Sequence, residues 1–276
     1  TGIQQRFPEV SLRKSCQWLS FRRQSFYSRR KKLKQLDKGI VPETKSDQGL
    51  LQLLQSARGE CVAWGFRMIC AYLRNQGHCF CKHRAHRIYK EAGMSLHRIP
   101  KKGRLERKFD ELPAPSRPDQ GWAMDFLSEM IIGENRQSVR LINIMDEYSR
   151  KDLWVEAHQS CPTDQLIKVL DQLLTTRNCP EYIRCDNGPE FISGKLKDWA
   201  EKSGIELRFI QPGKPTQNAF IERLNGTLRR ECLNLHWFDS LDELNEELQN
   251  WYYTYNFIRP HSALHYKTPH HFEAET

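Results

Sequence analysis

The chain has 276 residues, 38% of them hydrophobic, which is enough for one large domain or two ordinary ones with a packed core. It carries 43 Lys and Arg against 34 Asp and Glu, a net charge of +9. No run approaches the roughly 18 to 20 apolar residues of a membrane span, and the first residues lack an apolar signal region. We therefore expect neither a membrane protein nor a secreted one.

The charge is unevenly distributed along the chain. Residues 1–118 hold 26 Lys and Arg and 9 Asp and Glu, whereas residues 119–276 hold 17 and 25. A cationic part joined to an acidic part is typical of a phosphate-binding module beside a carboxylate-bearing one, although an ordinary solvated basic surface is the alternative. Nine Cys, an odd number without a signal region, favour a reducing compartment over a disulfide framework.

One local cluster suggests zinc at first sight: His78, Cys79, Cys81, His83 and His86. The Cys-x-Cys-x-His spacing packs the ligands more tightly than the usual Cys-x2-4-Cys knuckle. Residues 82–91 also have the pattern of a helix. We therefore favour a structural or DNA-facing role for this segment over a zinc site.

Three prolines within residues 113–118 predict a linker, because proline continues neither a helix nor a central strand. Residues 1–112 before it show a helical pattern broken by short turns, and residues 119–276 after it form the second domain. In residues 82–92, Arg84, Arg87 and Lys90 share a helix face that could lie against phosphates or enter a major groove. We predict two tandem helix-turn-helix units; a small helical bundle with a charged surface is the alternative. The expected helices are residues 11–19, one around 22–27, then 49–56, 64–73 and 82–92.

After the linker the pattern changes to strands followed by helices, which indicates an α/β domain with a mixed sheet. Thr163 is the expected N-cap of one helix, and Gly204 is expected to end the next. The predicted strands are residues 122–129, 140–145, 152–157, 182–186 and 205–210. The predicted helices are residues 164–177, 191–203, 216–232 and 240–255.

Three acids on separate elements of this second domain suggest a metal site. Asp125 lies inside an apolar strand, Asp186 ends a strand at an Asn-Gly turn, and Glu222 lies on a helix face that it shares with Asn218 and Arg229. A buried carboxylate is costly unless a cation lies nearby, and hard oxygen ligands favour Mg²⁺ or Mn²⁺. Two such ions about 3.5–4 Å apart can activate an attacking oxygen and stabilise a leaving one.

The alternative is that each of these acids is a salt-bridge or capping residue. Two further acids are weaker candidates for the metal site. We expect Asp146 to end the second strand and to pair with Arg150, and Glu190 to start a helix.

Four motifs in order resemble the integrase core of bacterial insertion-sequence transposases. They are Trp122-x-x-Asp125-Phe126, Asp146-x-x-Ser149-Arg150, Asp186-Asn187-Gly188-x-x-Phe191 and Asn218-Ala219-x-x-Glu222-x-x-Asn225-Gly226. Upstream, Trp64-Gly65-Phe66-Arg67 is similar to a signature in the family's helix-turn-helix. The resemblance covers nearly the whole chain. It is to the subgroup whose transposase is made from two overlapping reading frames, with this chain as the second-frame product.

The resemblance implies an RNase H-like fold, shared with retroviral integrases: a mixed five-stranded sheet with flanking helices, preceded by an all-α helix-turn-helix region. It also implies that Asp125, Asp186 and Glu222 form a three-acid catalytic site. Arg229 matches the basic residue that the family has seven positions after the glutamate, and Arg67 falls in the helix-turn-helix signature.

We therefore predict a transposase that cleaves transposon-end DNA and joins the freed 3′-OH to another phosphodiester. Arg223 and Arg229 are expected to hold the DNA backbone near the metal ions. The expected partners are double-stranded DNA, at the transposon ends and at the target, further copies of the chain on that DNA, and the first-frame product. The expected location is the bacterial cytoplasm, at the nucleoid. A non-catalytic DNA-binding regulator, an inactive relic and an RNase H-type nuclease are the alternatives.

Overall fold

The computed structural model describes residues 46–96, 115–133, 136–211 and 215–276. Contacts within the chain separate two compact units, Thr1–Leu96 and His97–Thr276. The helices predicted around residues 11–27 and the first two residues of the predicted linker lie outside the described residues, so these predictions stay open. No helix in the described ranges has the length and apolar character needed to cross a membrane.

The described part of the first unit consists of three helices, α4 (Asp47–Glu60), α5 (Phe66–Asn75) and α6 (Lys82–Glu91). Each coincides with a segment that the hydrophobic spacing predicted. The Ser46 side chain begins α4 by accepting a hydrogen bond of 3.1 Å from the Gly49 backbone N–H, which satisfies one free donor of the first turn. The apolar faces of the three helices meet in a small core whose buried members include Leu50, Leu54, Ile69, Leu73, Ala85 and Ile88.

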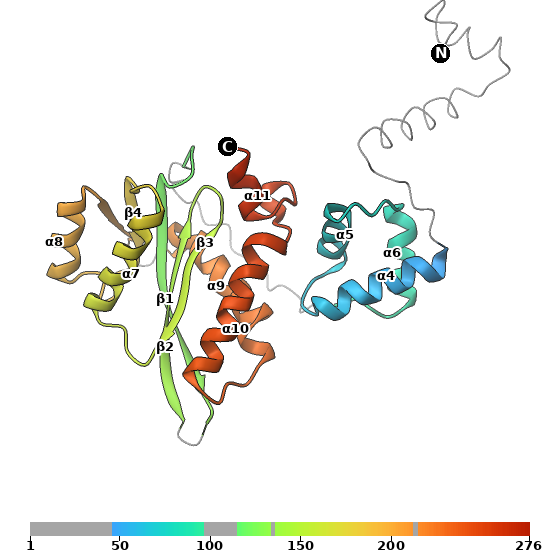
Figure 1. Ribbon diagram of the computed structural model, residues 1–276, viewed down its shortest axis with the longest axis horizontal. Helices are drawn as coiled ribbons and strands as arrows, with labels where there is room; N and C mark the ends of the chain where they lie inside the picture. Colours follow the sequence, from blue (N-terminus) through green and yellow to red (C-terminus); the bar gives the residue numbers. More distant parts are fainter. Residues whose placement is uncertain (1–45, 97–114, 134–135, 212–214) are drawn as a thin grey trace, which may run out of the picture. The chain divides into compact units, whose positions relative to one another are not determined.

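The second unit is built on a mixed sheet of five strands in the order β3-β2-β1-β4-β5 (Figure 1). Strand β1 pairs antiparallel with β2 and parallel with β4, and β5 continues the sheet parallel to β4. This confirms the predicted RNase H-like sheet. The strands are β1 (Gly121–Ile131), β2 (Gln137–Asp146), β3 (Asp152–His158), β4 (Tyr182–Cys185) and β5 (Glu206–Phe209).

Helices cover both faces of this sheet (Figure 1). On one face lie α7 (Thr163–Thr176) and α8 (Gly194–Ser203), and on the other lie α9 (Ala219–Glu231) and α10 (Leu241–Tyr253). Because side chains alternate along a strand, β1 sends Trp122 and Met124 into the α7–α8 core and sends Ala123 and Leu127 into the α9–α10 core. Asp125 alternates with the second set and therefore faces α9.

Several helix ends differ by a few residues from the prediction. Helix α7 is capped by Pro162, and the Thr163 hydroxyl, expected to be the N-cap, donates instead to the backbone carbonyl of Glu190. Helix α8 begins at Gly194 because Ser193 caps it, so Glu190 lies in the preceding turn and does not start the helix. Gly204 ends α8 in the left-handed conformation at φ 70°, as predicted.

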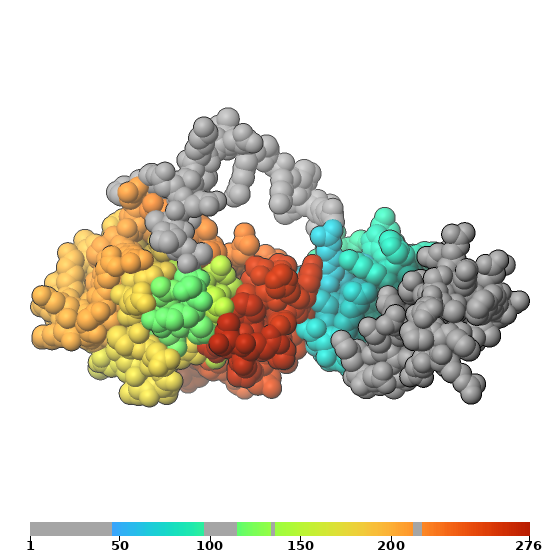
Figure 2. All heavy atoms as spheres, turned by 90° about the horizontal axis from the view of Figure 1, so that it is seen from above, coloured from blue at the N-terminus to red at the C-terminus, as the bar shows by residue number. Residues whose placement is uncertain are grey.

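A short 3₁₀ turn, Pro215–Asn218, precedes α9, and a π-helical turn, Thr254–Ile258, follows α10. The chain ends with α11 (Pro269–Ala274). In the space-filling view the C-terminal residues, in red, lie beside residues of the sheet domain in green (Figure 2). Helix α10 covers the edge strand β3, where Asn245 and Gln249 bond the backbone of Ala157 and Val155.

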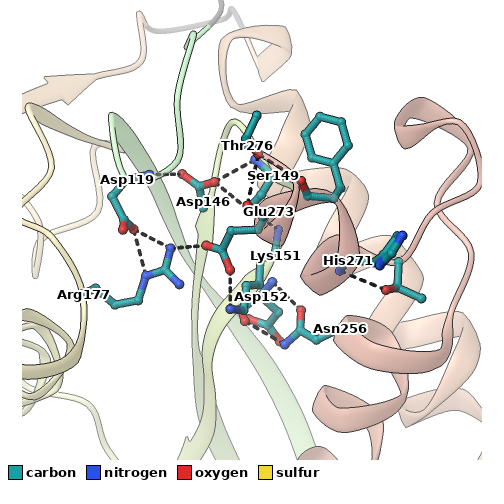
Figure 3. A network of polar contacts seen from close by, with 12 residues as sticks. Asp119, Asp146, Ser149, Lys151, Asp152, Arg177, Asn256, His271, Glu273 and Thr276 are labelled. Carbon is teal, nitrogen blue, oxygen red and sulfur yellow. Dashed lines mark hydrogen bonds and ion pairs between the residues drawn. The ribbon is translucent and has the colours of Figure 1, made fainter.

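A polar network joins α11 to the start of the sheet (Figure 3). Arg177 donates to the carboxylates of both Asp119 and Glu273, and Lys151 also donates to Glu273. These residues come from the loop before β1, the end of α7, the turn before β3, and α11. The ion pairs are therefore long-range contacts that fix the C-terminal helix against the sheet.

Asp146 ends β2, as predicted, but it does not pair with Arg150. Its fully buried carboxylate accepts hydrogen bonds from the Asp119 N–H and from both the N–H and the hydroxyl of Ser149 (Figure 3). The Arg150 guanidinium instead lies over the Phe220 ring, 3.3 Å from its centroid. The expected ion pair does not form, because the Asp146 carboxylate is already bonded by the Asp119 and Ser149 donors.

Candidate active site

Strand register places Asp125 and Asp186 on the same face of the sheet. In the parallel pair β1–β4, Ala123 is aligned with Arg184. Asp125 lies two residues beyond Ala123 and Asp186 lies two residues beyond Arg184, so the alternation of side chains points both carboxylates to the same side. Both are half-buried. Neighbouring parallel strands thus bring together two acids that are far apart in the sequence.

The turn after β4 holds the Asp186 carboxylate. Its Oδ1 accepts a hydrogen bond of 2.8 Å from the Gly188 N–H. A Cβ atom added at Gly188 would lie 3.0 Å from that same oxygen, so the close approach favours glycine at this position. The amide of Asn187 donates to the Ile210 carbonyl at 2.7 Å and ties the turn to the end of β5. The Asn-Gly pair therefore fixes where Asp186 leaves the strand.

Helix α9 brings Glu222 to the same face. One turn after Glu222, the Asn225 side-chain Nδ2 donates a hydrogen bond of 2.7 Å to Oδ2 of Asp125. Ile221 and Leu224 of the same helix are buried in the α9–α10 core. The apolar stripe thus seats α9 on the sheet, while Glu222 remains exposed on the side toward Asp125.

The pKa of Asp125 reflects its burial and its two acidic neighbours. Burial, with added contributions from the negative charges of Asp186 and Glu222, raises the pKa of Asp125 to about 6. Hydrogen bonds from the Phe126 backbone N–H and from Asn225 act in the opposite direction. The Asp125 carboxylate therefore lies close enough to both other predicted acids for their negative charges to oppose its own.

No three His, Cys, Asp or Glu side chains in the described ranges are arranged to hold a metal ion as they stand. The donor set nevertheless fits a hard divalent cation. It consists of the carboxylates of Asp125, Asp186 and Glu222, and oxygen ligands of this kind are those that Mg²⁺ and Mn²⁺ prefer. A divalent cation would offset both the burial of Asp125 and the negative charges of its neighbours, which together raise its pKa.

The predicted DNA-contacting residues on α9 have different surroundings. Arg223 is exposed. Arg229 donates to the Ser128 carbonyl at 3.2 Å and lies 3.5 Å from the Glu129 carboxylate, so it contacts β1. Asn218 is buried immediately before α9, and its Oδ1 has no hydrogen-bond partner in the described part of the chain. Arg223 and Arg229 are therefore both exposed cations, and Arg229 already has partners on β1.

In the three-helix unit, the predicted basic face of α6 is partly occupied by ion pairs. Arg84 and Arg87 both pair with Asp47 at the start of α4, and Arg87 also pairs with Glu91. Lys90 and Arg67 are exposed. Because Asp47 comes from a separate helix, the spacing of the basic residues alone did not indicate this neutralisation.

Two residues near the site were not assigned a role from the sequence. Asn225 stood in a family motif without a function, and Asn143 was not singled out. Both are buried and lie next to Asp125. The only available signal was a lone amide inside the apolar run of β2, where a polar side chain needs a partner.

Comparison with known proteins is consistent with this geometry. The integrase core domain family matches residues 115–215 and, separately, residues 203–269. An insertion element IS407 protein of 31.7 kDa from Burkholderia multivorans is 34% identical over 212 residues, which cover 77% of this chain and 76% of that protein. The chain belongs to the integrase-core family of bacterial insertion-sequence transposases. Proteins with this core are typically polynucleotidyl transferases, and a transposase-type function follows for this chain.

Further matches differ in how much of each chain they cover. An insertion element IS476 protein of 39.2 kDa from Xanthomonas euvesicatoria is 34% identical over 214 residues, 78% of this chain and 60% of that protein. Among solved structures, a chain of the simian T-cell lymphotropic virus intasome in complex with the PP2A regulatory subunit B56 gamma covers 77% of this chain and 71% of its own, with 18% identity and a TM-score of 0.49. The HTLV-2 integrase catalytic core domain in complex with magnesium covers 57% of this chain and 97% of its own, with 19% identity and a TM-score of 0.46.

Proposed function

We propose that this transposase is a divalent-metal-dependent DNA strand transferase whose catalytic acids are Asp125, Asp186 and Glu222. The observation that carries the proposal is the position of Asp125 at the centre of the sheet, where burial and the negative charges of two further acids raise its pKa. A divalent cation near these carboxylates would favour their charged form. An enzyme of this kind would use Mg²⁺ or Mn²⁺.

The chemistry proceeds in two displacements at phosphorus. Water attacks a phosphodiester at the transposon end, the bond from phosphorus to the 3′ oxygen breaks, and a 3′-OH is released. That 3′-OH then attacks a second phosphodiester, so one phosphorus–oxygen bond forms as another breaks. Two ions held by the three carboxylates would activate the attacking oxygen and stabilise the leaving one. The side chains of Asp125, Asp186 and Glu222 would hold and orient the reacting groups.

Double-stranded DNA is the proposed substrate, both at the transposon ends and at the target. The 26 Lys and Arg of residues 1–118 would supply most of the phosphate contacts, and these would be sensitive to salt. Exposed Arg67 and Lys90 of the three-helix unit and Arg223 beside Glu222 are the proposed contacts with the least intramolecular competition. Arg84, Arg87, Asn218 and Arg229 are proposed contacts that would have to exchange present partners or surroundings for DNA. Further copies of the chain and a first-frame product are proposed partners on the DNA.

The experiment is strand cleavage of a labelled transposon-end duplex with added Mg²⁺ or Mn²⁺ and the first-frame product. We expect Asp125→Asn, Asp186→Asn and Glu222→Gln each to abolish cleavage while DNA binding, measured by fluorescence anisotropy, is retained. Asp198→Asn, which removes an exposed acid on α8 outside the site, is the control and should cleave normally.

Cleavage that survives all three single substitutions would remove the assignment of the acids. Specific binding to transposon ends by the wild-type chain, without metal-dependent nicking, would favour a DNA-binding regulator. Cleavage of an RNA–DNA hybrid but not of the duplex would indicate an RNase H-type nuclease.

A further inference from the structure

Two buried asparagine side chains, Asn143 and Asn225, lie next to Asp125. Asn143 on β2 is the cross-strand partner of Asp125 in the antiparallel β1–β2 pairing. It is fully buried, and its Nδ2 donates a hydrogen bond to Oδ1 of Asn225 on α9. Asn225 in turn donates from its Nδ2 to Oδ2 of Asp125 at 2.7 Å. The three side chains therefore form a continuous relay from β2 through α9 to β1.

The chemistry of the groups fixes the direction of this relay. An ionised carboxylate only accepts hydrogen bonds, so Asn225 must present its NH₂ group to Asp125. Its carbonyl oxygen is then turned toward Asn143, which must present its own NH₂ group in the same way. The orientation of the Asn143 amide thus decides which atom Asn225 offers to Asp125.

Fold stability alone does not account for an amide at position 143. Its neighbours on the strand, Ile142 and Ile144, are fully buried apolar residues. The Asn143 Oδ1 atom is also buried, and it has no hydrogen-bond partner in the described residues. An unsatisfied buried acceptor costs free energy that an apolar side chain of the same size would not cost. This Oδ1 atom of Asn143 therefore lowers the stability of the fold compared with an apolar group at the same place.

We propose that Asn143 and Asn225 are positioning residues that hold the Asp125 carboxylate in the orientation needed for metal binding. The inference rests on the proposed function, because it presumes that Asp125 is a metal ligand. Asn225 fixes Oδ2, and the Phe126 backbone N–H, at 2.9 Å, fixes Oδ1, so the carboxylate plane is held from two sides. Neither asparagine touches the substrate; they act through Asp125.

The test measures the Mg²⁺ concentration that gives half-maximal strand cleavage, together with the melting temperature. Asn143→Leu keeps the branched shape and the number of heavy atoms of the side chain and removes the donor. We expect it to raise the required Mg²⁺ concentration about tenfold, because loss of a group that orients a metal ligand typically weakens metal affinity by that order. The melting temperature should change little, because the substitution removes one unsatisfied buried acceptor, the Asn143 Oδ1, and leaves another, the Asn225 Oδ1. Metal-free DNA binding should be unchanged.

Two further variants sharpen the comparison. Asn225→Ala should raise the Mg²⁺ requirement to a similar extent, because it removes the direct donor to Asp125. Asn256→Leu is the matched control: Asn256 is also a fully buried asparagine, but its amide bonds the backbone of Asp152 on β3. That control should lower the melting temperature and leave the Mg²⁺ requirement at the wild-type value.

A wild-type Mg²⁺ requirement in Asn143→Leu or in Asn225→Ala would overturn the proposal. Failure of Asn143→Leu to fold would also overturn it, because the relay assigns no net stabilising role to that amide. The proposed function fails in a distinguishable way, when the wild-type chain shows no metal-dependent cleavage or when Asp125→Asn remains active.

Discussion

Asp152 begins β3 with a fully buried carboxyl group, and neither of its oxygens has a hydrogen-bond partner in the described residues. Its backbone is well satisfied, because the N–H donates to the Asn256 side chain and the carbonyl accepts from it. Burial raises the pKa of Asp152 well above 3.8, and the nearby Trp154 backbone N–H offsets this only in part. Between the unfolded and the folded pKa, the folded protein therefore holds this carboxyl in its neutral form.

The effect of pH on stability follows from this shift. Above about pH 4 the unfolded chain releases the proton of Asp152 while the folded chain keeps it. Because the folded state then binds more protons, stability falls as pH rises through the unfolded pKa, and it continues to fall until the folded pKa is reached. The contribution of this one group is about 1.4 kcal/mol for each pH unit within that window.

Asp152→Asn removes the titration and keeps a side chain of the same shape. We expect the stability of Asp152→Asn relative to wild type to increase by about 1.4 kcal/mol per pH unit above about pH 4. The measurement is urea unfolding across a pH series, followed by tryptophan fluorescence.

Ile144→Val is the control for this series, because it removes one buried methylene and no ionisable group. It should lower stability by about 1 kcal/mol at every pH. If the stability difference between Asp152→Asn and wild type did not change with pH, the carboxyl would not be neutral in the folded state and the reasoning would be wrong.

Two further predictions concern the ends of helices. Gly204→Ala should destabilise the second unit by about 1 kcal/mol, because the helix-ending residue sits at φ 70°, where a Cβ atom is strained; a lowered urea midpoint would check this. Asp47→Ala should raise the affinity for DNA at low salt several-fold, because it removes a negative charge and releases Arg84 and Arg87 for phosphate contact. Fluorescence anisotropy over a salt series measures this affinity, and an unchanged affinity would show that these two arginines do not face the DNA.

Local patterns were sufficient to predict most of the elements. The alternation in β1 and the apolar spacing in α7 were strong enough to be recognised without any tertiary information. The errors fell at helix ends, as at Thr163 and Glu190, where a choice between neighbouring caps depends on what else each side chain can reach. Cap positions are therefore less certain than the elements themselves.

For the candidate site, too, the sequence predicted some features and missed others. The sequence placed Asp125, Asp186 and Glu222 on a strand, at a strand end and on a helix, which is where they lie. It did not reveal that Asn143 and Asn225, which are 82 positions apart, join behind Asp125. It also suggested an ion pair between Asp146 and Arg150 that the turn geometry prevents.

The sequence by itself determined the order of strands and helices, the basic and acidic halves, and the three acids, because each of these depends on residue type and local spacing. Only the tertiary structure decided which side chains share a face and which partner each polar group takes. Those choices depend on strand register and on the seating of α9 across the sheet, and both are set by packing between residues far apart in the chain. The hydrogen bonds around Asp125 belong to this second class, as do the ion pairs of Asp47.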